Sequence, residues 1–132
     1  MTFQVNAVNQ VAVTGSPSLT ITTAAAGSAP TAATDATSTW SVTTNQTGAK
    51  ITASIPAAMP AGLTLSATLT APATATGGGI KALSTTAADM VTNITKLSAS
   101  ALNITYQLDA TAAAGVQPSG TRLVTYTITG GT

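Results

Sequence analysis

The first residues of the chain alternate between apolar and polar side chains over an unusually long stretch. Residues 2–13 read TFQVNAVNQVAV, and side chains along an extended strand point alternately to opposite faces. One face therefore carries a row of apolar residues that only Asn9 interrupts: Phe3, Val5, Ala7, Val11 and Val13. The pattern predicts a strand of about 12 residues, roughly twice the usual length.

Nearly every later segment with a regular pattern has the same period of two. Further strands are expected at residues 18–22, 39–44, 49–55, 63–70, 80–86, 89–95, 102–109 and 122–129, which makes about nine strands in all. The clearest hairpin signal is Trp40–Ile55, in which the turn residues NQTG (45–48) join two alternating segments. Trp40 and Val42 are expected to point into the core.

This succession of short strands predicts an all-β fold, an antiparallel β-sandwich of the immunoglobulin-like type. The alanine runs predict no helix, because Gly and Pro lie among them and no period of 3.6 residues is present. With 132 residues, the chain is long enough for one hydrophobic core. We therefore expect a sandwich domain at residues 15–132, preceded by the long N-terminal strand at residues 1–14.

Charged residues are scarce, and this limits the partners of the protein. They make up 5% of the chain, the formal net charge is +1, and Glu, His and Cys are absent. Such a surface does not attract nucleic acid, and no run of about 18 apolar residues predicts a membrane span. A cytosolic protein so poor in charge would risk self-association. We therefore expect a secreted, extracellular protein at the cell surface.

The sequence predicts no enzyme. General acid–base and nucleophilic catalysis usually draw on His, Cys, paired carboxylates, or a Ser or Lys beside a base. The three acidic residues, Asp35, Asp89 and Asp109, are scattered, and no S-x-x-K or G-x-S-x-G motif occurs. Zinc requires His or Cys, and Ca²⁺ requires clustered oxygen ligands. We expect no catalytic, cofactor-binding or metal-binding residues.

Two surface features remain open to interpretation. Asn45, Asn93 and Asn103 each begin an N-x-Thr sequon and are possible glycosylation sites, although a chain so rich in Thr contains sequons by chance. Trp40, Tyr106 and Tyr126 have the chemistry to stack on a sugar. All three fall on predicted inward faces, so a role in the core is favoured.

The long first strand poses the main question, because its nearest downstream neighbour is only half as long. The strand either crosses between the two sheets of its own domain or leaves the domain and completes a sheet of a neighbouring subunit. Burying Phe3, Val5, Val11 and Val13 would contribute about 1.5–3 kcal/mol for each side chain. Docking in a neighbour joins subunits head to tail, and such an interface does not close on itself, so it produces a filament.

An alternating N-terminal segment ahead of a Thr- and Ala-rich sandwich resembles the subunits of donor-strand-exchange fibres. These are the chaperone–usher pilins and the TasA-like biofilm fibre proteins. The resemblance lies in the composition and strand pattern of the whole chain. It implies a non-catalytic subunit of an extracellular pilus, fimbrium or biofilm fibre, with identical subunits as partners and the first strand as the polymerisation interface. The alternative hypothesis is a monomeric secreted adhesin or carbohydrate-binding module whose loops contact a ligand.

Overall fold

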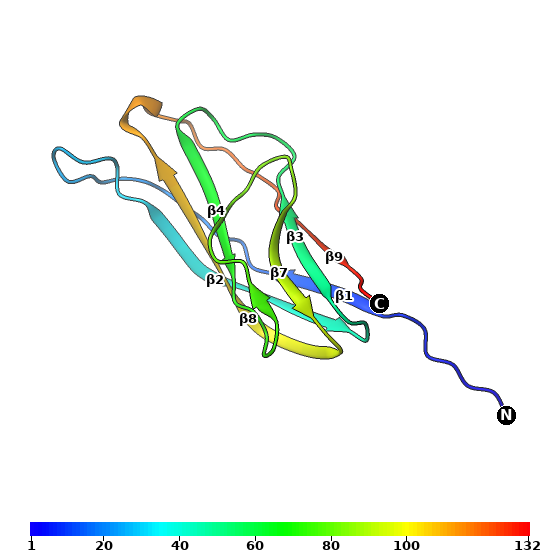
Figure 1. The fold of residues 1–132 in the computed structure, drawn as a ribbon. Helices are drawn as coiled ribbons and strands as arrows, with labels where there is room; N and C mark the ends of the chain where they lie inside the picture. The colour runs from blue at the N-terminus through cyan, green and yellow to red at the C-terminus, as the bar shows by residue number, and fades with distance from the viewer.

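The computed structural model describes residues 1–132 and confirms that the protein is all-β. No α-helix is present, and the only helical element is a 3-10 turn at Ala112–Ala114. Figure 1 shows the strands aligned along the long axis of the molecule. The nine strands are β1 (Asn9–Thr14), β2 (Ala33–Thr44), β3 (Ala49–Ser54), β4 (Leu63–Leu69), β5 (Thr76–Gly77), β6 (Lys81–Ala82), β7 (Ala88–Ile94), β8 (Leu97–Ala110) and β9 (Thr125–Thr129).

The strands form two antiparallel sheets that pack against each other in a sandwich-like arrangement. The first sheet has the order β1-β2-β8-β4-β6, and the second has the order β5-β7-β3-β9. Every pairing in both sheets is antiparallel. Strands β1 and β9 are edge strands, one from each sheet, and they lie near each other on the same side of the molecule.

The core lies between the two sheets and follows the period-two pattern. Trp40 in β2 is 1% exposed and packs in one cluster with residues of the second sheet such as Ile51 and Met90. The predicted inward row of residues 49–55 is confirmed, since all four of its alternate apolar side chains are buried. The hydroxyl groups of Tyr106 in β8 and Tyr126 in β9 lie 2.6 Å apart and link the two sheets by a hydrogen bond.

The predicted hairpin Trp40–Ile55 is wrong, although its turn is where the pattern places it. β2 pairs with β1 and β8, whereas β3 pairs with β7 and β9, so the turn at residues 45–48 carries the chain from one sheet to the other. Gly48 has a φ of 77°, which a residue with a side chain rarely adopts. The two apolar rows therefore face each other across the core instead of lying side by side.

The predicted strand at residues 18–22 is also absent, and the first strand is shorter than expected. β1 comprises only Asn9–Thr14, and its partner is β2 at Thr39–Thr44 rather than a neighbour within a local hairpin. Gly15 has a φ of 125°, and Pro17 provides no backbone N–H, so the sheet ladder ends here. Leu19 nevertheless packs against the core.

Candidate functional site

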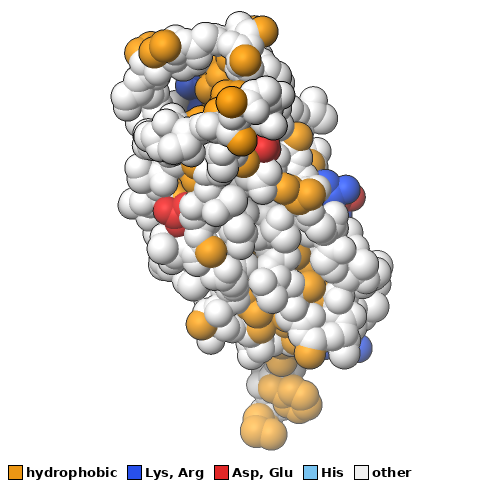
Figure 2. All heavy atoms as spheres, turned by 90° about the vertical axis from the view of Figure 1, so that its left-hand side faces the viewer, with side chains coloured by type: hydrophobic (Ala, Val, Ile, Leu, Met, Phe, Trp, Pro, Cys, Tyr) orange, Lys and Arg blue, Asp and Glu red, His pale blue; other side chains and the backbone are white.

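Residues 1–8, which we call the N-terminal tail, extend away from the body of the protein. Figure 1 shows the tail leaving one end of the sandwich along the direction of the strands. All eight residues are exposed, including Phe3 at 90% and Val5 at 83%. In Figure 2 apolar atoms cover this protruding end. The tail therefore presents two large apolar side chains, two positions apart, that nothing in the same chain covers.

The structure divides the predicted interface row between two environments. Phe3, Val5 and Ala7 lie in the exposed tail. Val11 and Val13 lie in β1, where they pair with Val42 and Trp40 of the chain's own first sheet. Val11 packs against the core, while Val13 remains 36% exposed at the sheet edge. The predicted N-terminal strand thus consists of a docked half and a free half.

Asn45, the residue after β2, marks the boundary between these halves. Its side-chain Oδ1 accepts a hydrogen bond from the Val8 backbone N–H at 2.8 Å, and its Nδ2 donates to the Asn6 carbonyl oxygen at 2.8 Å. Its backbone N–H donates to the Val8 carbonyl oxygen at 3.1 Å. We call these three bonds the Asn45 clamp. The clamp extends the docked part of the chain by three residues beyond β1, to Asn6.

The turn that carries the clamp is itself held by neighbouring segments. Gln46 accepts a hydrogen bond from the Asn9 side chain at 2.6 Å and donates one to the Gly131 carbonyl oxygen at 3.2 Å. The backbones of Thr47 and Thr132 exchange two hydrogen bonds at 2.8 and 3.0 Å. The N-terminal strand, the turn and the C-terminus therefore form one hydrogen-bonded unit at this end of the molecule.

The side of the molecule formed by β9 has backbone that no strand pairs with. β9 pairs only with β3, so its outer edge is free, and the alternation of exposed and partly buried residues extends back from β9 to Thr121. We call Thr121–Thr129 the β9 edge. Its inward side chains Val124 and Ile128 pack against the core but are only partly buried, and Leu123 is 75% exposed. Residues 15–23, which follow β1, also lack a sheet partner.

Arg122 ties the start of the β9 edge to the loop between β3 and β4. Its Nη2 donates to the Ala58 carbonyl oxygen and its Nη1 to the Thr121 carbonyl oxygen, both at 2.9 Å. Its Nε is shielded and has no hydrogen-bond partner. Figure 2 shows a hollow at the end opposite the tail, with apolar side chains around it and basic atoms within it.

The acidic groups do not come together in a site. The Asp35 carboxylate accepts hydrogen bonds from Thr37 Oγ1 at 2.6 Å and from the Thr37 and Ser18 backbone N–H groups, and these bonds lower the pKa of Asp35. Asp89 forms an exposed ion pair with Lys50 at 3.1 Å, and Asp109 accepts from Gln107. No group of three potential metal ligands is present.

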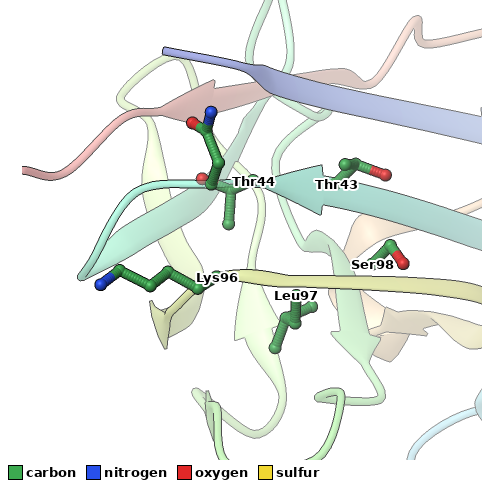
Figure 3. Close-up of a pocket in the computed structure, with 6 residues that line it drawn as sticks. Thr43, Thr44, Lys96, Leu97 and Ser98 are labelled. Carbon is green, nitrogen blue, oxygen red and sulfur yellow. The ribbon is translucent and has the colours of Figure 1, made fainter. Parts of the chain in front are cut away.

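A shallow depression of about 420 Å³ lies where β2 ends and β8 begins. In Figure 3 the Lys96 side chain extends away from Thr43 and Ser98. Thr44, Asn45 and Leu97 complete the lining, which contains neither a carboxylate nor an aromatic ring. Lys96 is the only charged side chain in this lining.

The three sequon asparagines lie in different surroundings. Asn45 uses its side-chain nitrogen in the clamp, Asn93 is exposed in β7 and donates to Thr76, and Asn103 is half-buried in β8. The sequence does not predict that Asn45 holds the N-terminal tail, because a polar residue in a turn is the only feature that the sequence shows at this position. The β9 edge was also missed, because an unpaired edge depends on the order of strands in the sheet.

Comparison with known proteins identifies no relative. No protein-family model matches the chain, and no curated protein sequence or solved structure is significantly similar to it. No helix in the structure has the length and apolar character needed to cross a membrane.

Proposed function

We propose that this protein is a non-catalytic structural subunit of an extracellular filament, such as a pilus or biofilm fibre. In this filament the N-terminal tail of one subunit adds as a strand to the next subunit. The observation that carries the proposal is the exposed tail, with Phe3 and Val5 outside the body. Burying each of these side chains in a neighbour would contribute about 1.5–3 kcal/mol. Strand addition would also satisfy the backbone groups of the tail.

The β9 edge is the surface of the neighbouring subunit that best fits the tail. The five tail residues beyond the clamp span about 17 Å when extended, and the nine residues of the β9 edge span about 30 Å, so the edge is long enough to receive them. Its inward apolar row is incompletely covered, which leaves room for the alternate side chains of an added strand. Length and chemistry therefore agree.

The directions of the two segments agree as well. The tail leaves at the end of the molecule where β9 finishes, and the start of the β9 edge lies towards the opposite end (Figure 1). A copy moved along the strand direction would receive the tail beside its own β9, antiparallel to it. The tail and the receiving edge are different surfaces, so repeated addition continues without closure and forms a filament.

Other parts of the structure are compatible with this role. The two facing antiparallel sheets support an immunoglobulin-like arrangement, with residues 15–132 and β1 as the receiving body and the tail as the donor. The scarcity of charge favours a secreted protein at the cell surface, where such a fibre would contribute to cell adhesion. No observation supports the adhesin or carbohydrate-binding module, since the only tryptophan and Tyr106 are buried.

The proposal is tested by electron microscopy of the purified full-length protein, with a tail peptide as inhibitor. We expect unbranched filaments, and we expect an excess of a peptide of residues 1–8 to cap the receiving edge and leave short oligomers. The same peptide with Asp at position 5 is the matched control and should leave the filaments unchanged. A monomeric protein over a wide range of concentration would contradict the proposed function.

A further inference from the structure

We propose that Asn45 is a positioning residue that orders the N-terminal tail for donation to the next subunit, an inference that rests on the proposed function. A primary amide carries one donor group and one acceptor, as a peptide group does. β2 ends at Thr44, which pairs with Asn9, and the backbone then turns away. The Asn45 side chain takes the place of the next strand residue by bonding to the backbone of Val8 and Asn6.

The clamp can direct the tail because the turn that carries Asn45 is itself held in place. The turn at residues 45–48 is bonded to the C-terminal residues and to β1 through Gln46. The Lys96 backbone N–H also donates to the Gln46 carbonyl oxygen at 2.9 Å. Residues 6–8 are therefore held in line with β1, and the tail points away from its own body (Figure 1).

Holding residues 6–8 reduces the cost of assembly. A flexible segment loses conformational entropy when it binds, and a segment that is already extended loses less. With the clamp in place, only residues 1–5 remain to be ordered when Phe3 and Val5 enter the next subunit. Removal of the clamp should leave the receiving β9 edge intact while weakening the donor.

Hydrogen exchange in the monomer tests the clamp directly. A Val5→Asp background keeps the full-length protein monomeric, and we expect Asn45→Ala in that background to accelerate exchange of the Val8 amide at least tenfold. Thr47→Ala is the matched control, because it removes the sequon that begins at Asn45 and leaves the Asn45 amide in place. Exchange of Val8 should be unchanged in that control, which separates the clamp from any effect of a glycan.

Assembly kinetics test the positioning role. Asn45→Ala alone should slow filament elongation about tenfold, equivalent to about 1.4 kcal/mol. The affinity of the residue 1–8 peptide for full-length Val5→Asp should not change when Asn45→Ala is added, since the peptide occupies the β9 edge. A merely structural role for Asn45 would weaken peptide binding as well, and that result would overturn the inference.

The remaining outcomes separate this inference from the function on which it rests. Unchanged Val8 exchange or a wild-type elongation rate in Asn45→Ala would overturn the positioning role while leaving filament formation intact. Failure of the wild-type protein to form filaments would overturn the proposed function, and the positioning role with it.

Discussion

The two halves of the N-terminal segment have the same alternating pattern and different environments. In residues 9–14 the backbone is paired with β2, and Val11 packs against the core. In residues 1–8 the backbone continues past the end of β2, and Phe3 and Val5 remain exposed. The difference arises from the partner strand, because β2 ends at Thr44 and its chain turns towards the other sheet.

This comparison shows that amphipathic alternation identifies a face to be buried but not the surface that buries it. Each exposed apolar side chain of the tail forgoes about 1.5–3 kcal/mol of burial. The core around Trp40 packs without these side chains, so nothing within the same chain gives a reason for an exposed apolar tail. The proposed role of the tail between subunits gives that reason.

The largest expected effect is a difference in the free energy of unfolding when the same substitution, Val to Asp, is made in each half of the N-terminal segment. Val11→Asp places a carboxylate against the core and should lower the free energy of unfolding of the monomer by about 2 kcal/mol or more. Val5→Asp should change it by less than about 0.5 kcal/mol, because Val5 is exposed in the monomer. Urea unfolding followed by the fluorescence of Trp40, the only tryptophan, measures both.

Filament assembly should show the opposite pattern for the tail variant. Val5→Asp should abolish filaments, because an unpaired carboxylate would enter the receiving edge. Equal destabilisation of the monomer by both substitutions would mean that the tail docks on its own body. Filaments formed by Val5→Asp at the normal rate would remove Val5 from the interface.

A disulfide cross-link should locate the receiving surface. The chain has no cysteine, so two introduced cysteines can pair only with each other or with copies of themselves. We expect a mixture of Gln4→Cys and Leu123→Cys subunits to form a mixed dimer under mild oxidation, seen on a non-reducing gel, because both side chains would lie on the outward face when Val5 faces the core. Leu123 is exposed at the β9 edge and accessible to a neighbouring tail.

The matched control uses the β6 edge, which belongs to the first sheet. β6 is a two-residue edge strand, and Ala82 is exposed there. Gln4→Cys mixed with Ala82→Cys should produce little mixed dimer. A higher yield at position 82 than at position 123 would move the receiving surface to β6 without contradicting filament formation.

Much of the fold is predictable from the sequence, because burial on one face of a strand leaves a direct record in the pattern. The inward positions of Trp40, Val42 and Ile51, the burial of Ile104 and Tyr106 in β8, and the alternation in β9 all follow from period two. The pairing of strands does not follow. The NQTG turn is compatible with a hairpin and with a crossing between sheets, and only the packing of the two apolar rows decides between them.

The candidate site is less predictable than the fold. The apolar row of the first strand was visible, but the point at which it leaves the body depends on the end of β2 and on the Asn45 amide. The pattern does place the end of β2 before the NQTG turn, but it does not show that β2 pairs with the first strand or that the Asn45 amide bonds to Val8 and Asn6. The β9 edge is free because of strand order, which is a property of the whole sheet.

The smallest expected effect concerns pH, and it involves the body and not the tail. Burial, then the hydrogen bond to Tyr106, raises the pKa of Tyr126, and burial also raises the pKa of Tyr106. Folding therefore favours the neutral rings, and this stabilisation is complete below the unfolded pKa of about 10 and lost as pH rises above it. The lowered pKa of Asp35 acts at the other end, where its contribution is lost as pH falls below about 4.

Between these limits, the free energy of unfolding should vary by less than about 0.5 kcal/mol from pH 5 to pH 8, since the chain has neither His nor Glu. Urea unfolding at pH 3, 5, 8 and 11 measures this profile. Tyr126→Phe is the control for the alkaline decline, because it removes one of the two hydroxyl groups that must ionise, and it should flatten the profile above pH 10. A steep change between pH 5 and 8 would contradict this assignment of the titrating groups.

Filament stability should be equally flat over that range, because residues 2–8 contain no ionisable side chain. A filament that dissociates between pH 5 and 8 while the monomer stays folded would place a charged group in the interface, against the apolar contact proposed for Phe3 and Val5.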